Sequence, residues 1–187
     1  SFLPDFWFTH PLTTERMSEA RLRANQLPAV KPKLNDQDFE IIKWYSRVLS
    51  RQTSEEQLSL MNRQNNFAGQ LALAAYQIQQ SDFQAAQAAL DQAKKHNQMH
   101  PLLVLFQTDI YLGRNQLNAA LKSVASAARI MPENRALNYK YAEVLIRAQQ
   151  PDQAKQIVQK FLNANSRDVS GWRLMQLATN AEPASAI

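Results

Sequence analysis

Cysteine is absent from the sequence, and glycine occurs only three times in 187 residues. Without cysteine the chain has neither a disulfide framework nor a cysteine-ligated zinc site. Few glycines, together with many alanine, glutamine, leucine and arginine residues, favour helix over strand. These absences predict an all-α protein.

Long apolar runs and long runs of like charge are also missing. No stretch approaches the ~20 apolar residues that a membrane-spanning helix needs, so no membrane span is expected. The net charge is only +5, and the basic residues are scattered among acidic ones. A solvated surface explains this better than a nucleic-acid-binding face, so nucleic acid is not an expected partner.

Catalytic motifs are scarce as well. The chain has three histidines, His10, His96 and His100, and no His-Glu-x-x-His sequence. His96 and His100 are spaced for a metal on one helix face, but no third ligand is evident. Asp109 and Glu143 are paired carboxylates without a nucleophile beside them, so solvated surface residues are the simpler interpretation. No cofactor and no enzymatic activity are therefore expected of this chain, and no catalytic residue is predicted.

The strongest positive signal is an internal repeat. Ala86, Ala120 and Ala154 are each separated by 34 residues, and Phe83, Leu117 and Pro151 repeat the same spacing. This pattern resembles the tetratricopeptide repeat, in which a small alanine lets two antiparallel helices approach closely. The resemblance implies a solenoid of tandem antiparallel helical hairpins.

The register sets the expected hairpins. They run from about 66 to 96, from 101 to 131 and from 135 to 164, and a fourth begins at Asp168 with Trp172 at an aromatic position that fills the gap between hairpins. An irregular capping hairpin is expected at 36–65, and the array is expected to be truncated at both ends.

Local end signals accompany the register. Capping boxes are predicted at Ser81/Gln84 and Thr53/Glu56. Gly113 is predicted to supply a left-handed helix C-cap, and Pro151 to lie in the first turn of a helix.

The N-terminal segment carries a second resemblance. Phe6-Trp7-Phe8-Thr9-His10-Pro11 followed by Arg16 is similar to the closing segment of the catalytic domain of M48 zinc metallopeptidases. It implies that 1–27 is the tail of a missing peptidase domain. The prolines at 28 and 32 predict a linker at 28–35, and the repeat register predicts the capping hairpin at 36–65 and the array at 66–187. By the same resemblance, Zn²⁺ belongs to the missing domain, and His10 lies near it only in the intact protein.

The register also predicts a concave groove lined by the first helix of each hairpin. Its predicted partner-binding residues are Leu105, Asp109, Leu112, Tyr139, Glu143, Ile146, Arg147 and Arg173, with Leu177 beside them. Such a groove suits a helix or an extended segment of a partner protein.

The functional hypothesis follows from the groove and the resemblance together. The chain is expected to dock substrates and partners for a periplasmic zinc metalloprotease that acts in outer-membrane β-barrel protein assembly and quality control. Its partners would be outer-membrane β-barrel proteins and their assembly machinery. The alternatives are a free-standing tetratricopeptide scaffold with no protease attached, and an enzyme or nucleic-acid binder in its own right.

Overall fold

The computed structural model describes Ser18 and residues 22–23, 36–51 and 53–181. The predicted peptidase tail, the linker and His10 lie outside these residues, so these predictions stay untested. Within the described part, the chain from Asp36 onward forms one compact all-helical unit, which confirms the predicted fold class. No helix in that part is long and apolar enough to cross a membrane.

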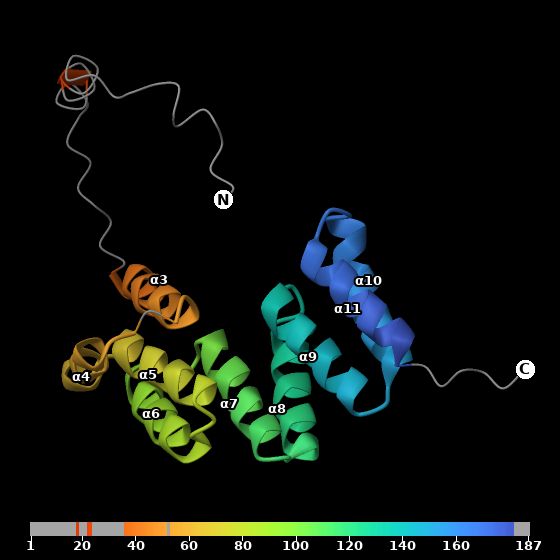
Figure 1. The fold of residues 1–187 in the computed structure, drawn as a ribbon. Coiled ribbons are helices and arrows are strands. Elements are labelled where there is room, and N and C mark those ends of the chain that lie inside the picture. Colours follow the sequence, from red (N-terminus) through yellow and green to blue (C-terminus); the bar gives the residue numbers. More distant parts are fainter. Residues whose placement is uncertain (1–17, 19–21, 24–35, 52, 182–187) are drawn as a thin grey trace, which may run out of the picture. The chain divides into compact units, whose positions relative to one another are not determined.

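The unit consists of helices packed in sequential pairs (Figure 1). Their bounds are α3 (Asp36–Leu49), α4 (Glu55–Gln64), α5 (Phe67–Gln79), α6 (Phe83–His96), α7 (Pro101–Gly113), α8 (Leu117–Ile130), α9 (Arg135–Arg147), α10 (Pro151–Ala164) and α11 (Val169–Asn180). The pairs α5/α6, α7/α8 and α9/α10 coincide with the three predicted hairpins, and α11 opens the fourth.

The small residues of the repeat lie where two helices meet. Ala86, Ala120 and Ala154 are each fully buried, with no exposed surface. Around them, apolar clusters run from α3 through α7, through α8, and on to α9–α11. The repeated alanines therefore mark the points where neighbouring helices of the array pack most closely.

Each first helix of the array begins on a polar cap that recurs every 34 residues. The cap residues are Asn66, His100, Asn134 and Asp168, and the side chain of each accepts a backbone N–H of the helix that follows. Such caps satisfy N–H groups that have no partner inside the helix. The periodicity of the caps went unnoticed in the sequence because three different residue types fill one position.

The turns inside the hairpins also repeat, although without glycine. Ser81, Asn115 and Gln149 have φ values of 61°, 58° and 58°. In each turn the following residue donates a backbone hydrogen bond five residues back, as Gln150 does to Leu145 at 2.9 Å. This is the Schellman end of a helix, with a non-glycine residue in the left-handed conformation.

The structure corrects several local predictions. Gly113 does not supply the left-handed residue, which is Asn115, and no glycine among the described residues has a positive φ. Gly113 is needed for space instead, because a Cβ there would run into the ring of Phe83. Trp172 does not fill a gap between hairpins but is 52% exposed, with its ring N–H bonded to the Ser166 carbonyl.

Neither predicted capping box forms at the predicted residues: the one at α4 is displaced by one residue, and α6 has a simple N-cap in place of a box. The α4 box is made by Ser54 and Gln57 rather than by Thr53 and Glu56. At α6 the N-cap is Asp82, and Ser81 is the left-handed residue of the turn before it. Pro151, by contrast, lies in the first turn of α10 as predicted.

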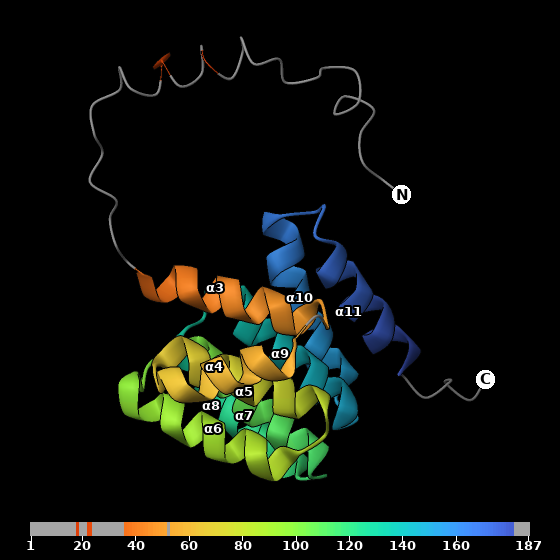
Figure 2. The ribbon, with the colours of Figure 1, turned by 60° about the vertical axis from the view of Figure 1, so that its left-hand side comes forward.

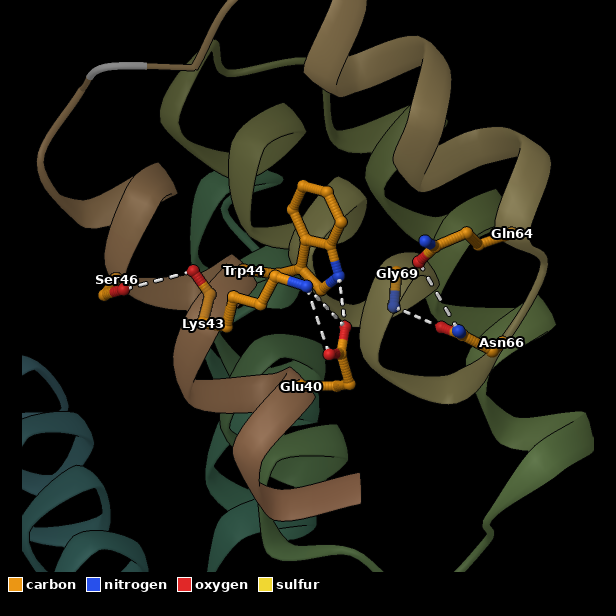
Figure 3. A network of polar contacts seen from close by, with 7 residues as sticks. All are labelled: Glu40, Lys43, Trp44, Ser46, Gln64, Asn66 and Gly69. Carbon is orange, nitrogen blue, oxygen red and sulfur yellow. Dashed lines mark hydrogen bonds and ion pairs between the residues drawn. The ribbon is translucent and has the colours of Figure 1, made fainter. Parts of the chain in front are cut away.

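The first two helices depart from the regular pattern. Helices α3 and α4 each pack against α5 and not against one another. In both ribbon views α3 lies on the side of α5 that faces away from α6 (Figures 1 and 2). Trp44 is 3% exposed, and its ring N–H bonds the Glu40 carboxylate at 2.9 Å (Figure 3).

Candidate interaction groove

First helices of successive hairpins line a hollow on the surface of the compact unit. The groove has a volume of about 680 Å³ and is bordered by α7, α9 and α11. Its lining residues are Leu105, Ala136, Tyr139, Lys140, Glu143, Ile146, Arg147, Ser170, Arg173, Leu174 and Leu177. The repeat explains this set, because positions 34 residues apart occupy the same face of successive first helices.

Most of the predicted groove residues are brought together here. Leu105, Tyr139, Glu143, Ile146, Arg147, Arg173 and Leu177 all line the hollow. Two predicted residues do not. Leu112 packs instead against the cluster of Ala120, Val124 and Val144, and Asp109 lies next to the lining, where it pairs with Lys140.

A chain of alternating charges runs along α9 and joins it to α7. The Lys140 ammonium group lies 2.8 Å from the Asp109 carboxylate and 2.7 Å from that of Glu143. Glu143 also accepts a hydrogen bond from Arg147 at 3.0 Å. Asp109 and Glu143 are therefore neutralised by cations, so they present less negative charge to a partner than the sequence alone suggests.

Burial and the neighbouring charges act in opposite directions on the pKa values of Asp109 and Lys140. Burial raises the pKa of the Asp109 carboxyl group, and the nearby Lys140 offsets this only in part. Burial lowers the pKa of Lys140, but the two carboxylates outweigh it and raise that pKa above its ordinary value. Lys140 therefore stays charged and bridges α7 to α9.

Sequence reasoning missed Lys140, although a signal existed. Ala136, Lys140, Glu143 and Arg147 are spaced by three or four residues, which places them on one face of a helix. The predicted set contained Glu143 and Arg147 of this face but not Lys140. Ser170 and Leu174, the counterparts of Ala136 and Lys140 in the next repeat, were also not predicted.

Tyr139, which was expected at the centre of the groove, is 9% exposed. Its hydroxyl donates to the Asp168 carboxylate at 3.0 Å, and its ring meets Phe161 edge-on at 5.5 Å between centroids. Burial and the Asp168 hydrogen bond raise the pKa of Tyr139 to about 12. Tyr139 thus mainly holds α9, α10 and the start of α11 together.

Asp168 is the other half of that junction. Its carboxylate accepts hydrogen bonds from the Tyr139 hydroxyl and from the backbone N–H groups of Ser170 and Gly171. It also forms an ion pair with Arg135 at 2.9 Å. Burial raises the pKa of Asp168, but these donors outweigh it and hold the pKa below the ordinary value. A Cβ at Gly171 would lie 2.6 Å from the Tyr139 hydroxyl, so the close approach of α11 to α9 requires glycine there.

No metal site accompanies the groove. Within the ranges that the structure describes, no three histidine, aspartate or glutamate residues come close enough to hold an ion. His100 serves as the N-cap of α7, where Nδ1 accepts the Leu102 N–H at 3.2 Å, and its ring lies against Phe67. The arrangement of the groove suits binding through apolar contact and charge, and offers no visible nucleophile–base pair.

Comparison with known proteins agrees with this architecture. The family profile described as Tetratricopeptide repeat matches residues 111–178. The chain is 30% identical over 192 residues to the Beta-barrel assembly-enhancing protease of Yersinia pestis. The aligned region covers 94% of this chain and 37% of that protein. It is 26% identical over 185 residues to the protein of the same name from Escherichia coli (strain K12), and this alignment covers 95% of this chain and 38% of that protein.

Proposed function

Because this chain is a tetratricopeptide-repeat protein with homology over nearly its whole length to beta-barrel assembly-enhancing proteases, we propose that it docks client proteins for a protease of that kind. The observation that carries the proposal is the groove along α7, α9 and α11. It combines partly exposed apolar side chains with cations, and its acidic lining residue Glu143 is already paired. This chemistry suits the capture of a protein segment.

The catalytic part of the proposal lies outside this chain. The chain spans only about 37–38% of the length of these relatives, which leaves room for a peptidase domain. We propose that the intact protein is a periplasmic zinc metallopeptidase with a His-Glu-x-x-His helix upstream, and that His10 lies near its Zn²⁺ ion. The clients would be outer-membrane β-barrel proteins and the machinery that assembles them.

Docking through a groove has a kinetic advantage in such a protein. A client held on the array stays close to the catalytic domain, so its effective concentration there rises without tight binding. Modest contacts with Ile146, Leu174 and Leu177 would then suffice.

The docking proposal is tested with a purified outer-membrane β-barrel protein that is unfolded in urea and diluted into buffer containing this chain. Binding is measured by fluorescence anisotropy of the labelled client. We expect Leu177→Asp to weaken binding at least about tenfold, because a charge replaces a half-exposed apolar contact. Ile130→Asp on α8 is the matched control, since Ile130 is exposed but lies outside the groove lining.

Equal binding by the Leu177→Asp and wild-type chains, with unchanged helical circular dichroism, would exclude the groove as the docking site. The link to a protease is tested separately by sequencing the encoding gene upstream of codon 1. A His-Glu-x-x-His sequence there supports it, whereas an unrelated domain or a nearby start codon leaves a scaffold without a protease.

A further inference from the structure

Helix α3 covers one end of the face that carries the groove. It packs against α5 on the side away from α6 (Figures 1 and 2), and makes no such packing with α4. Its buried side chains Ile41, Trp44 and Val48 belong to the same apolar cluster as Leu71 and other residues of α5. The Gln79 side chain also donates to the Val48 carbonyl at 3.1 Å, which fixes the end of α3.

The repeat register shows which surface α3 covers. Ala136, Tyr139, Lys140 and Glu143 line the groove on α9, and their counterparts on α5 are found 68 residues earlier. Those counterparts are Ala68, Leu71, Ala72 and Ala75, which are 4%, 2%, 2% and 6% exposed. On α11 the counterparts Ser170, Arg173 and Leu177 are exposed. The same face is thus filled at its α5 end and open at its α11 end.

The filled part ends where the groove begins. Tyr45 of α3 lies against Phe106 of α7, with 5.6 Å between the ring centroids. Phe106 occupies the repeat position that Lys140 and Leu174 hold in the groove. Burial and then the negative charge of Asp109 raise the pKa of Tyr45, against the opposing effect of Lys140. Helix α3 therefore reaches α7 through Tyr45, at the repeat position next to the groove.

The open part has a definite chemistry. Ile146, Leu174 and Leu177 give it apolar contact area. Arg147 is paired with Glu143, whereas Arg173 is exposed and shows no hydrogen bond or ion pair to any other residue that the structure describes. The groove thus presents an apolar surface beside a cation that pairs with none of the described residues.

We infer that the groove takes an amphipathic helix of a partner protein, seated against α9 and α11 as α3 is seated against α5. The inference rests on the proposed docking function and specifies its ligand. The bound helix carries aromatic and branched apolar side chains on one face, as α3 does with Trp44 and Tyr45. A carboxylate at the edge of that face meets Arg173, because an unpaired cation beside an apolar surface favours an anionic neighbour.

A probe with this chemistry exists within the chain. The acetylated and amidated peptide of residues 36–49, DQDFEIIKWYSRVL, carries the α3 apolar face together with Asp38 and Glu40. It is titrated into the full isotope-labelled chain, and binding is followed by NMR chemical-shift changes. We expect changes at Ile146, Leu174 and Leu177, and at least about fivefold weaker binding to Arg173→Glu, the size expected when a surface ion pair becomes a repulsion.

Two controls make the result specific. Arg129→Glu changes an exposed arginine of α8 outside the groove lining, and it should bind the peptide like the wild type. A peptide with Ser46→Pro keeps the apolar face but cannot form an unbroken helix, so its binding should fall at least about tenfold.

Three outcomes would overturn the inference. Equal binding of the Ser46→Pro peptide would mean that the groove takes an extended segment, which leaves the docking function intact. Shift changes confined to Leu71, Ala72 and Phe106 would mean that the peptide replaces α3. Absence of binding, or binding insensitive to both Arg173→Glu and Leu177→Asp, would mean that the open face does not accept such a helix, whatever the client assay shows.

Discussion

At the scale of single residues, the junction of Tyr139 with Asp168 determines how α11 is placed beside α9. One carboxylate caps α11, accepts the tyrosine hydroxyl and pairs with Arg135. Gly171 leaves room for that hydroxyl. The position of the α11 side of the groove therefore depends on a few short polar contacts.

The Tyr139→Phe variant should change how stability depends on pH. The pKa of Tyr139 is about 12 in the folded chain against 10.0 for the ordinary side chain, so the unfolded chain loses this proton first as the pH rises. Stability that is present in full below pH 10 is then lost as the pH rises through 12. At pH 7 the variant should be less stable by about 1 kcal/mol, the net value of one hydrogen bond.

Urea unfolding at pH 7 and at alkaline pH measures the difference between the two proteins. The difference in unfolding free energy should narrow above pH 10, because only the wild type has a tyrosine hydroxyl at position 139 that can lose its proton. A gap that stays constant with pH would contradict the assignment of the raised pKa to Tyr139.

The Ala86→Leu variant tests the small position of the repeat. Ala86 is fully buried where α6 meets its neighbours, so a larger side chain should cost about 1–3 kcal/mol through overpacking. Ala88→Leu is the matched control on the exposed side of the same helix and should be nearly neutral. Equal stability of the two variants in thermal unfolding would show that α6 does not approach its neighbours as closely as described.

At the scale of the helices, caps and turns recur with the same 34-residue period as the core alanines. Asn66, His100, Asn134 and Asp168 open the first helices, and Ser81, Asn115 and Gln149 close them in the left-handed conformation. Each end is satisfied by its own local hydrogen bonds. The residues at which each helix begins and ends are therefore marked by local hydrogen bonds.

The Gln149→Gly variant should be more stable than the wild type. A side chain at φ 58° is strained where glycine is not, and relief of that strain should outweigh the added freedom of the unfolded chain by about 0.5–1 kcal/mol. Asn115→Gly should gain less, because asparagine tolerates this conformation better. Chemical denaturation of both variants checks the order, and a loss of stability in Gln149→Gly would show that its side chain makes a contact worth more than the strain.

At the scale of the whole compact unit, stability should be distributed along the array. Each pair of helices contacts mainly its neighbours in the chain, so a local defect is expected to spread only a short way. Helix α3 is the exception in its packing, since it lies across α5 and reaches α7 through Tyr45. The two ends of the array are thus built differently.

The Trp44→Ala variant should reveal this difference by hydrogen exchange. Trp44 is almost fully buried, and its removal should cost about 3–5 kcal/mol in the region that it supports. We expect faster exchange in α3 and α5 and unchanged exchange in α9–α11. Trp172→Ala, at a half-exposed position, is the control and should affect α11 alone; uniform loss of protection in Trp44→Ala would mean that the array unfolds as one unit.

The repeated part of this protein could be predicted from the spacing of its amino acids. The 34-residue register gave the three hairpins and most of the groove-lining residues, because identical spacing places side chains on equivalent helix faces wherever the helices pack. The register did not predict which of two adjacent polar residues caps a helix, as at Ser54 and Asp82. Adjacent polar residues can cap a helix almost equally well.

Contacts between segments that are far apart in the chain could be seen only in the folded structure. The seat of α3 on α5, the Lys140 bridge between Asp109 and Glu143, and the capture of Tyr139 by Asp168 join residues that no local pattern relates. Because of these contacts, Tyr139 holds helices together instead of lying at the centre of a binding surface, and Asp109 and Glu143 are paired with Lys140. The periodicity of the chain locates the groove, but its charge and its open length are set by side chains that meet only after folding.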